Sequence, residues 1–118
     1  MGEPVMMNSR PWGNYLTLYE SGDTKVKIIT VLPRHRLSYQ SHENRSEHWV
    51  VVSGQGLVTM EGESNQHSVN DYIYVPTKVK HRIQNTGDSN LVFVEIQTGS
   101  SFEEEDIVRY DDDYGRAE

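Results

Sequence analysis

Residues 40–54 read QSHENRSEHWVVVSG, which predicts two extended segments around a short polar turn. Gln40 and His42 are two positions apart, so on a strand both side chains leave the same face. Glu47 then opens a run of Trp and Val that ends in a Ser-Gly turn signal. His81 lies in a second polar cluster, downstream. If these segments pack together, an amide oxygen, a carboxylate and two imidazoles converge, and such ligands suit a divalent metal such as zinc, manganese or iron.

The remainder of the chain predicts an all-β fold. Short segments that are alternating or rich in Val and Ile lie between turns of Gly, Pro, Asn and Asp, and no long helical period or repeat interrupts them. We expect strands over residues 15–19, 25–32, 37–42, 47–53, 57–60, 66–69, 72–75, 81–85 and 91–98. After an acidic run at 103–106, typical of a solvated face, residues 107–110 predict a short helical turn or an edge strand.

Length and composition restrict the class of protein. The chain has 118 residues, which suits a single domain, and we expect a flexible leader over residues 1–9 and one domain over 10–118. The net charge of -7 disfavours nonspecific nucleic-acid binding, and the absence of cysteine excludes disulfides and thiolate metal sites. No apolar run is long enough to span a membrane and no signal core is present, so a cytoplasmic protein is expected.

The two polar clusters resemble the two motifs of the cupin superfamily. The first motif, with Gln in place of its first His, is matched by Gln40, His42, Glu47 and Gly54. The second is matched by Pro76, His81 and Asn85. The run 45–54, the opening 10–15 and the ending 106–116 more specifically resemble the isomerase domain of type II phosphomannose isomerases. These are the cupin domains at the C terminus of bifunctional mannose-6-phosphate isomerase/mannose-1-phosphate guanylyltransferases.

The resemblance implies a fold, a reaction and a metal. The fold would be a single-domain cupin jelly-roll barrel, also called a double-stranded β-helix. The reaction would be the interconversion of mannose 6-phosphate and fructose 6-phosphate, with a divalent metal stabilising the negative charge that develops on the sugar oxygens. The implied ligands are Gln40, His42, Glu47 and His81. Zinc is the expected metal, and manganese, cobalt and magnesium remain open.

The sequence leaves the catalytic base open. His48 and Glu95 are the candidates, although alternation along the strand separates His48 from the face that carries Glu47. Arg45 sits in the ligand turn and is expected to bind the phosphate or a developing oxyanion. Lys27 and Arg82 are further candidates for binding the phosphate.

Several alternatives stay open at this stage. The chain lacks the nucleotidyltransferase domain and any Gly-rich phosphate loop, so no guanylyltransferase activity is expected. A noncatalytic sugar-binding cupin would keep the pocket but lack a base. An iron oxygenase is disfavoured by the Gln ligand, and a metal-free partner-binding module is the remaining alternative. A homodimer is expected, because small jelly rolls leave edge strands that are commonly paired.

Overall fold

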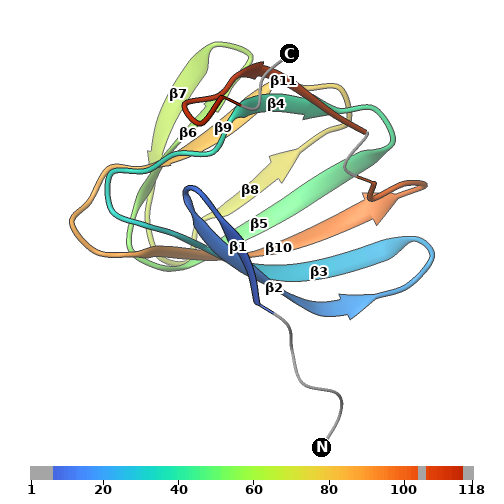
Figure 1. Ribbon diagram of the computed structural model, residues 1–118, viewed down its shortest axis with the longest axis horizontal. Helices are drawn as coiled ribbons and strands as arrows, with labels where there is room; N and C mark the ends of the chain where they lie inside the picture. The colour runs from blue at the N-terminus through green and yellow to red at the C-terminus, as the bar shows by residue number, and fades with distance from the viewer. Residues whose placement is uncertain (1–6, 104–105, 116–118) are drawn as a thin grey trace, which may run out of the picture.

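The computed structural model describes residues 7–103 and 106–115, and within these residues the chain forms eleven strands and no α-helix (Figure 1). The strands are β1 (Met7–Arg10), β2 (Gly13–Glu20), β3 (Thr24–Val31), β4 (Tyr39–His42), β5 (Arg45–Ser53), β6 (Gly56–Met60), β7 (Glu63–His67), β8 (Tyr72–Val75), β9 (His81–Asn85), β10 (Leu91–Gly99) and β11 (Ile107–Asp111). The all-β prediction is confirmed. In the described part of the chain, no helix has the length and hydropathy needed to cross a membrane.

The strands form two antiparallel sheets that face each other (Figure 1). One sheet has the order β1-β2-β3-β10-β5-β8, and the other has the order β11-β4-β9-β6-β7. Strands that are distant in the sequence therefore become neighbours, such as β10 between β3 and β5. The interior between the two sheets holds both the apolar core and the polar residues of the predicted site.

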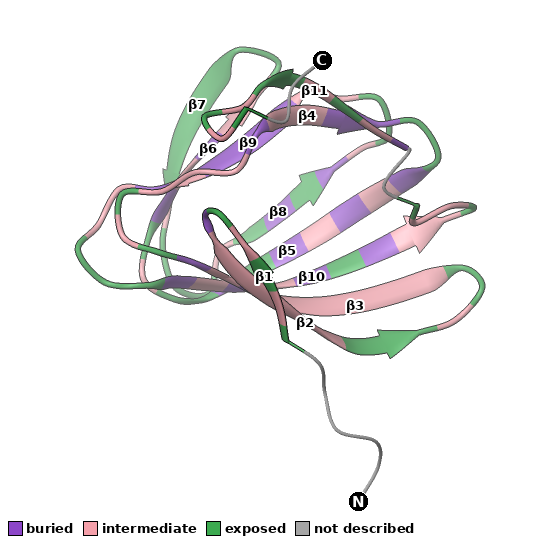
Figure 2. Cartoon of the chain, in the orientation of Figure 1, coloured by how far each residue is buried: buried purple, intermediate pink, exposed green. Residues whose placement is uncertain are grey.

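Alternation along the central strands decides which side chains enter this interior. On β5 and β10, buried and more accessible residues alternate, as the bands in Figure 2 show. This is the period of two that a strand imposes when one of its faces is covered. The buried apolar residues form one cluster: Trp12, Ile29, Val31, Trp49, Val51, Val58, Ile73, Val75, Ile83, Leu91 and Phe93.

The first strand, β1, lies partly within the predicted leader. Met7, Asn8 and Ser9 pair with residues of β2, so the leader prediction fails for them, and residues 1–6 lie outside the described part. The turn between β1 and β2 buries Trp12, which anchors the hairpin to the core. Gly13 follows with φ +153°, and a Cβ there would lie 2.0 Å from the backbone oxygen of Thr30. Only glycine allows β2 to approach β3 this closely.

Two further boundaries differ from the prediction. The β6–β7 hairpin turns at Glu61 and Gly62, both with positive φ, whereas the turn was expected over 61–64 with a strand at 66–69. This two-residue turn matches the twist of the paired strands and brings the second strand forward to Glu63.

In the tail, β11 pairs with β4 at the edge of its sheet, so the edge-strand alternative is right. Asp106 is buried, unlike the solvated face expected there, and residues 104–105 and 116–118 lie outside the described part.

Candidate metal centre

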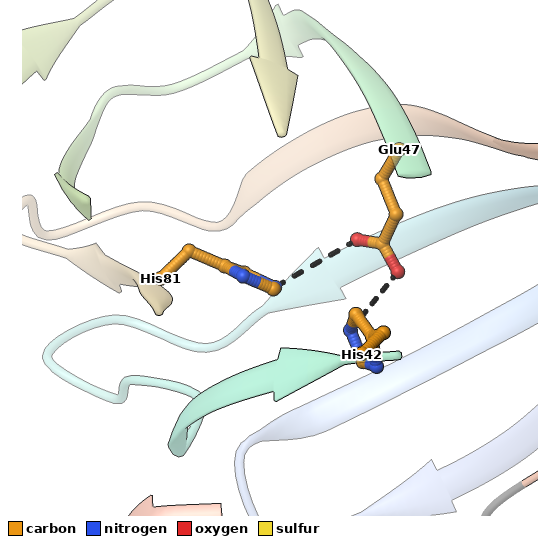
Figure 3. Close-up of side chains that lie close together, drawn as sticks. All are labelled: His42, Glu47 and His81. Carbon is orange, nitrogen blue, oxygen red and sulfur yellow. Dashed lines mark ion pairs between the residues drawn. The ribbon is translucent and has the colours of Figure 1, made fainter. Parts of the chain in front are cut away.

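Three predicted ligands meet in the interior. His42 comes from β4, Glu47 from β5 and His81 from β9, and their side chains point toward one another (Figure 3). Their ligand atoms all lie within 4.8 Å of one another. His42 Nε2 is 3.2 Å from Glu47 Oε2, and His81 Nε2 is 4.0 Å from Glu47 Oε1. All three residues are buried.

The hydrogen bonds of His81 prepare it to bind a metal. Its Nδ1 lies 2.9 Å from the backbone oxygen of Val79, so Nδ1–H donates and the neutral ring carries its lone pair on Nε2. That Nε2 is buried without a hydrogen-bond partner among the described residues. A backbone carbonyl that fixes the ring of a ligand histidine in this way is typical of metal sites.

The electrostatics also suit a divalent cation. Burial lowers the pKa of His42 to about 4 and lowers the pKa of His81, so both rings are neutral at pH 7. Burial alone would raise the pKa of Glu47, but its interactions with His42, His81, Glu95 and Arg45 together hold that pKa well below its usual range. Two neutral imidazoles and one carboxylate therefore face a common point, and this donor set fits zinc and neighbouring transition metals.

Gln40 stands next to this group. It precedes His42 by two residues on β4, it pairs across the sheet with His81, and it lines the same cavity. Its role as a fourth ligand stays a prediction.

A second carboxylate lies beside Glu47. The indole N–H of Trp49 donates to Glu47 at 3.0 Å and to Glu95 at 3.1 Å, and the side-chain amide of Gln97 donates to the same pair. Burial and the charge of Glu47 raise the pKa of Glu95 to about 8. The pKa values of the two carboxyl groups thus differ widely, so that Glu47 is ionised while Glu95 is able to hold a proton near neutral pH. Sequence reasoning did not single out Gln97.

The cavity around the centre is rich in cations although the whole chain is acidic. Five cationic side chains line it: Arg10, Lys27, Arg45, Arg82 and Arg109. The sequence predicted three of them and missed Arg10 and Arg109, although both fall in segments that carry the family resemblance. They come from β1 and β11, the outermost strands of the two sheets, and reach a site built mainly on inner strands.

Two of the predicted cations also have structural partners. Arg45 donates from Nε to Glu47 Oε2 at 3.1 Å, so it orients the ligand carboxylate. Arg82 donates to the backbone oxygen of Leu37 at 2.9 Å and to both the side chain and the backbone oxygen of Asp111. Lys27 places its ammonium 4.1 Å from the centre of the Tyr15 ring, at the wall of the cavity.

His48 lies on the other side of the sheet. Its Nδ1 is 2.6 Å from the hydroxyl of Tyr72, and its ring packs beside Tyr72 and Tyr74. Successive residues of a strand point to opposite faces, and His48, unlike its neighbours Glu47 and Trp49, does not line the cavity. In the structure, His48 therefore lies outside the cavity that Glu47 and Glu95 line.

Comparison with known sequences identifies the family of this chain. The family described as "Mannose-6-phosphate isomerase C-terminal" matches residues 5–112. The chain belongs to this family. It is 44% identical over 107 residues to mannose-1-phosphate guanylyltransferase ManC of Salmonella typhimurium, and equally to alginate biosynthesis protein AlgA of Pseudomonas aeruginosa. Each match covers 91% of this chain but 22% of the relative, so the chain spans less than a quarter of their length.

Solved structures support the predicted cupin fold. The capsular polysaccharide assembling protein CapF of Staphylococcus aureus superposes with a TM-score of 0.80 at 21% identity, over 93% of this chain and 35% of that one. A Klebsiella pneumoniae protein with a double-stranded beta-helix domain superposes with a TM-score of 0.69 at 18% identity, over 75% of this chain and 77% of that one. The jelly-roll prediction is confirmed.

Proposed function

We propose that this domain is a metal-dependent mannose-6-phosphate isomerase that interconverts mannose 6-phosphate and fructose 6-phosphate, without guanylyltransferase activity. The observation that carries the proposal is one cavity in which His42, Glu47 and His81 meet beside a carboxyl group of raised pKa and a set of cationic side chains. Membership of the phosphomannose isomerase family supports the substrate class.

The cationic side chains account for an anionic substrate. Guanidinium and ammonium groups bind phosphate through charge-assisted hydrogen bonds, and Arg also pairs with it in a bidentate manner. Lys27, Arg10 and Arg109 line the cavity on three different strands. We propose that this group holds the phosphate and so orients the sugar carbons toward the metal centre.

Glu95 is the candidate for moving the proton. Isomerisation removes a proton from C2 of the aldose and returns one to C1 of the ketose, so one carboxyl group can serve both steps. A group that exchanges its proton near neutral pH is suited to this task, and burial beside Glu47 gives Glu95 that property. Trp49 and Gln97 hold its carboxyl group in place by donating to it.

His42, Glu47 and His81, with Gln40 beside them, are the residues that would hold the divalent metal, for which zinc is the first choice. The metal, when bound, would act as a Lewis acid on the sugar oxygens. Arg45 keeps the Glu47 carboxylate oriented for this role. The homodimer and the cytoplasmic location stay predictions.

A coupled assay of mannose 6-phosphate conversion tests the proposal. Protein loaded with zinc, manganese, cobalt or magnesium should produce fructose 6-phosphate, and His81→Ala should abolish the conversion. His67→Ala is the matched control, because His67 pairs with Asp71 on the β7–β8 connection, outside the cavity. If wild-type protein binds metal and sugar phosphate but does not convert it with any of these metals, the isomerase proposal fails and a sugar-binding cupin replaces it.

A further inference from the structure

The turn between β4 and β5 sets the spacing of two metal ligands. β4 ends at His42 and β5 begins at Arg45, so Glu43 and Asn44 alone connect the strands that carry His42 and Glu47. A displacement of this turn changes the distance between an imidazole and a carboxylate that must bind the same ion. Whatever fixes the turn therefore acts on the centre.

Asp106 holds this turn with both carboxylate oxygens. Its Oδ1 accepts from the backbone N–H of Glu43 at 3.1 Å and from the side-chain amide of Asn44 at 2.9 Å. Its Oδ2 accepts from the backbone N–H of Asn44 at 3.0 Å. The residue is 8% exposed, which is unusual for an aspartate inside an acidic run. The carboxylate of Asp106 thus accepts hydrogen bonds from three N–H donors of the turn, which would otherwise need water as their partner.

The backbone confines the same turn from other directions. The carbonyl of His42 accepts from the N–H of Lys78 at 2.7 Å, and the carbonyl of Asn44 accepts from the N–H of Ser100 at 2.9 Å. Gly99 packs directly against it, and a Cβ at Gly99 would lie 2.2 Å from the Asn44 oxygen. On the side that faces Asp106, a single side chain accepts the hydrogen bonds of the turn.

Asp106 also connects the turn to the tail of the domain. The next residue, Ile107, pairs with His42, and Arg109 pairs with Gln40, so β11 lies along the ligand strand β4. We propose that Asp106 is a positioning residue for the metal centre: it fixes the separation of His42 and Glu47 through the 43–44 turn. This inference rests on the proposed metal site and adds a residue that touches neither metal nor substrate.

The test measures metal binding rather than turnover. In Asp106→Asn, an amide NH2 replaces one acceptor and faces the N–H donors of the turn. Partners of this kind, when lost, typically weaken metal affinity by about 10–100-fold. We expect the Kd for Co²⁺, measured by chelator competition, to rise about 10-fold or more in Asp106→Asn. The visible absorption bands of the cobalt-loaded protein should also change, since they report ligand geometry.

Matched variants separate positioning from general stability. Asp88→Asn makes the same change in charge at an exposed carboxylate that pairs with Arg34, and it should leave the cobalt Kd and spectrum unaltered. Asn44→Ala removes only the exposed side-chain donor to Asp106 and should weaken cobalt binding less, by about 3-fold, roughly the loss of one modest hydrogen bond. Because Asn44 acts through Asp106, the double variant should bind cobalt no more weakly than Asp106→Asn alone.

The outcomes decide between the two accounts. If Asp106→Asn lowers the thermal midpoint while the cobalt Kd and spectrum stay as in wild type, Asp106 is only a structural anchor and the inference fails. If Asp106→Asn does not fold, an unchanged cobalt Kd and spectrum in Asn44→Ala overturn it in the same way. Wild-type protein that binds no cobalt, zinc or manganese overturns the proposed function itself, and the role of Asp106 with it.

Discussion

The two ends of the barrel interior are built from the same strands but differ in chemistry. At one end, Phe93 on β10 lies opposite Ile29 and Val51, and all three are buried and apolar. Two residues further along β10, Glu95 lies opposite Lys27 at the edge of the polar cavity. One step of two residues therefore separates the apolar core from the polar candidate site. The apolar end supplies stability, and the polar end uses that rigidity to hold charged groups that would otherwise be costly to bury.

Trp49 forms the boundary between the two ends. Its ring packs against Phe93, with centroids 5.2 Å apart, while its N–H donates to Glu47 and Glu95. An indole is large and apolar but carries one donor, so it can belong to both regions at once. If the division is real, substitutions on the two sides should affect different observables.

Phe93→Ala should have the largest effect and should act on stability. Removing a fully buried ring leaves a cavity and costs about 3–5 kcal/mol of the free energy of unfolding. Chemical denaturation measures this loss, and the cobalt Kd of the folded fraction should stay near the wild-type value. Val52→Ala on the exposed face of β5 is the control, expected within about 0.5 kcal/mol. A large change in Kd without a loss of stability would contradict the division.

Glu47→Gln should act on the opposite side of the boundary. Loss of the only anionic ligand in the described cluster should weaken metal binding about 100-fold, roughly 2.7 kcal/mol, as measured by chelator competition. The metal-free protein should lose part of its stability at pH 7, because the low pKa of Glu47 means that the fold stabilises its ionised form and because the buried Arg45 loses its carboxylate partner. The exposed Glu63→Gln on β7 is the control for metal binding. Unfolding of metal-free Glu47→Gln would show that the polar end also maintains the fold.

Glu95→Gln should change how stability depends on pH in the metal-free protein. The folded-state pKa of Glu95 is raised, so its contribution to stability is present below its unfolded value and is lost as pH rises toward about 8. The glutamine side chain of the variant does not titrate. Relative to wild type, the variant should gain on the order of 2 kcal/mol between pH 5 and pH 7. Chemical denaturation across this pH range measures the difference in the free energy of unfolding between variant and wild type. A difference that does not depend on pH would contradict a raised pKa of Glu95.

Lys27→Met should affect substrate binding more than turnover. Its ammonium lines the cavity, and losing one charged contact to a phosphate should raise KM about 10-fold with a smaller change in kcat. Lys25→Met is a matched control on the same strand, because Lys25 pairs with Glu20 and does not line the cavity. Steady-state kinetics of mannose 6-phosphate conversion compare the two. Equal effects of both variants would indicate general electrostatic attraction rather than a specific contact.

His48→Ala should have the smallest effect. The side chain lies on the outer face with Tyr72, so kcat/KM should change less than about 2-fold, the level expected of a surface substitution. A loss of 100-fold at unchanged stability would instead support a catalytic role for His48.

Sequence reasoning succeeded where the information is local. Alternation in the β10 region follows from the period of a strand, so the fold class could be predicted, and the resemblance to the cupin motifs named His42, Glu47 and His81, which the structure brings together. Sequence reasoning failed where distant segments meet. Asp106 belongs to an acidic run, and only its contact with the 43–44 turn, more than 60 residues earlier, explains its burial.

The edges of the sheets were also difficult to predict. β1 has no hydrophobic period, because its pairing with β2 depends on the turn at Trp12 rather than on a buried face. Arg10 and Arg109 reach the cavity from such outer strands, and a single arginine in a short strand has no pattern that distinguishes it from a solvated one. That Arg10 and Arg109 line the cavity follows only from the order of the strands in the two sheets.

The stepwise change from apolar to polar residues along β10 bears on how the chain avoids misalignment during folding. A slip of two residues between neighbouring strands preserves the alternation of inner and outer faces, so alternation alone does not reject it. Such a slip of β10 against β5 would place Glu95 opposite Val51, within the apolar cluster, where an unpaired carboxylate is strongly disfavoured. The polar groups of the candidate site thus also identify the correct alignment of the strands.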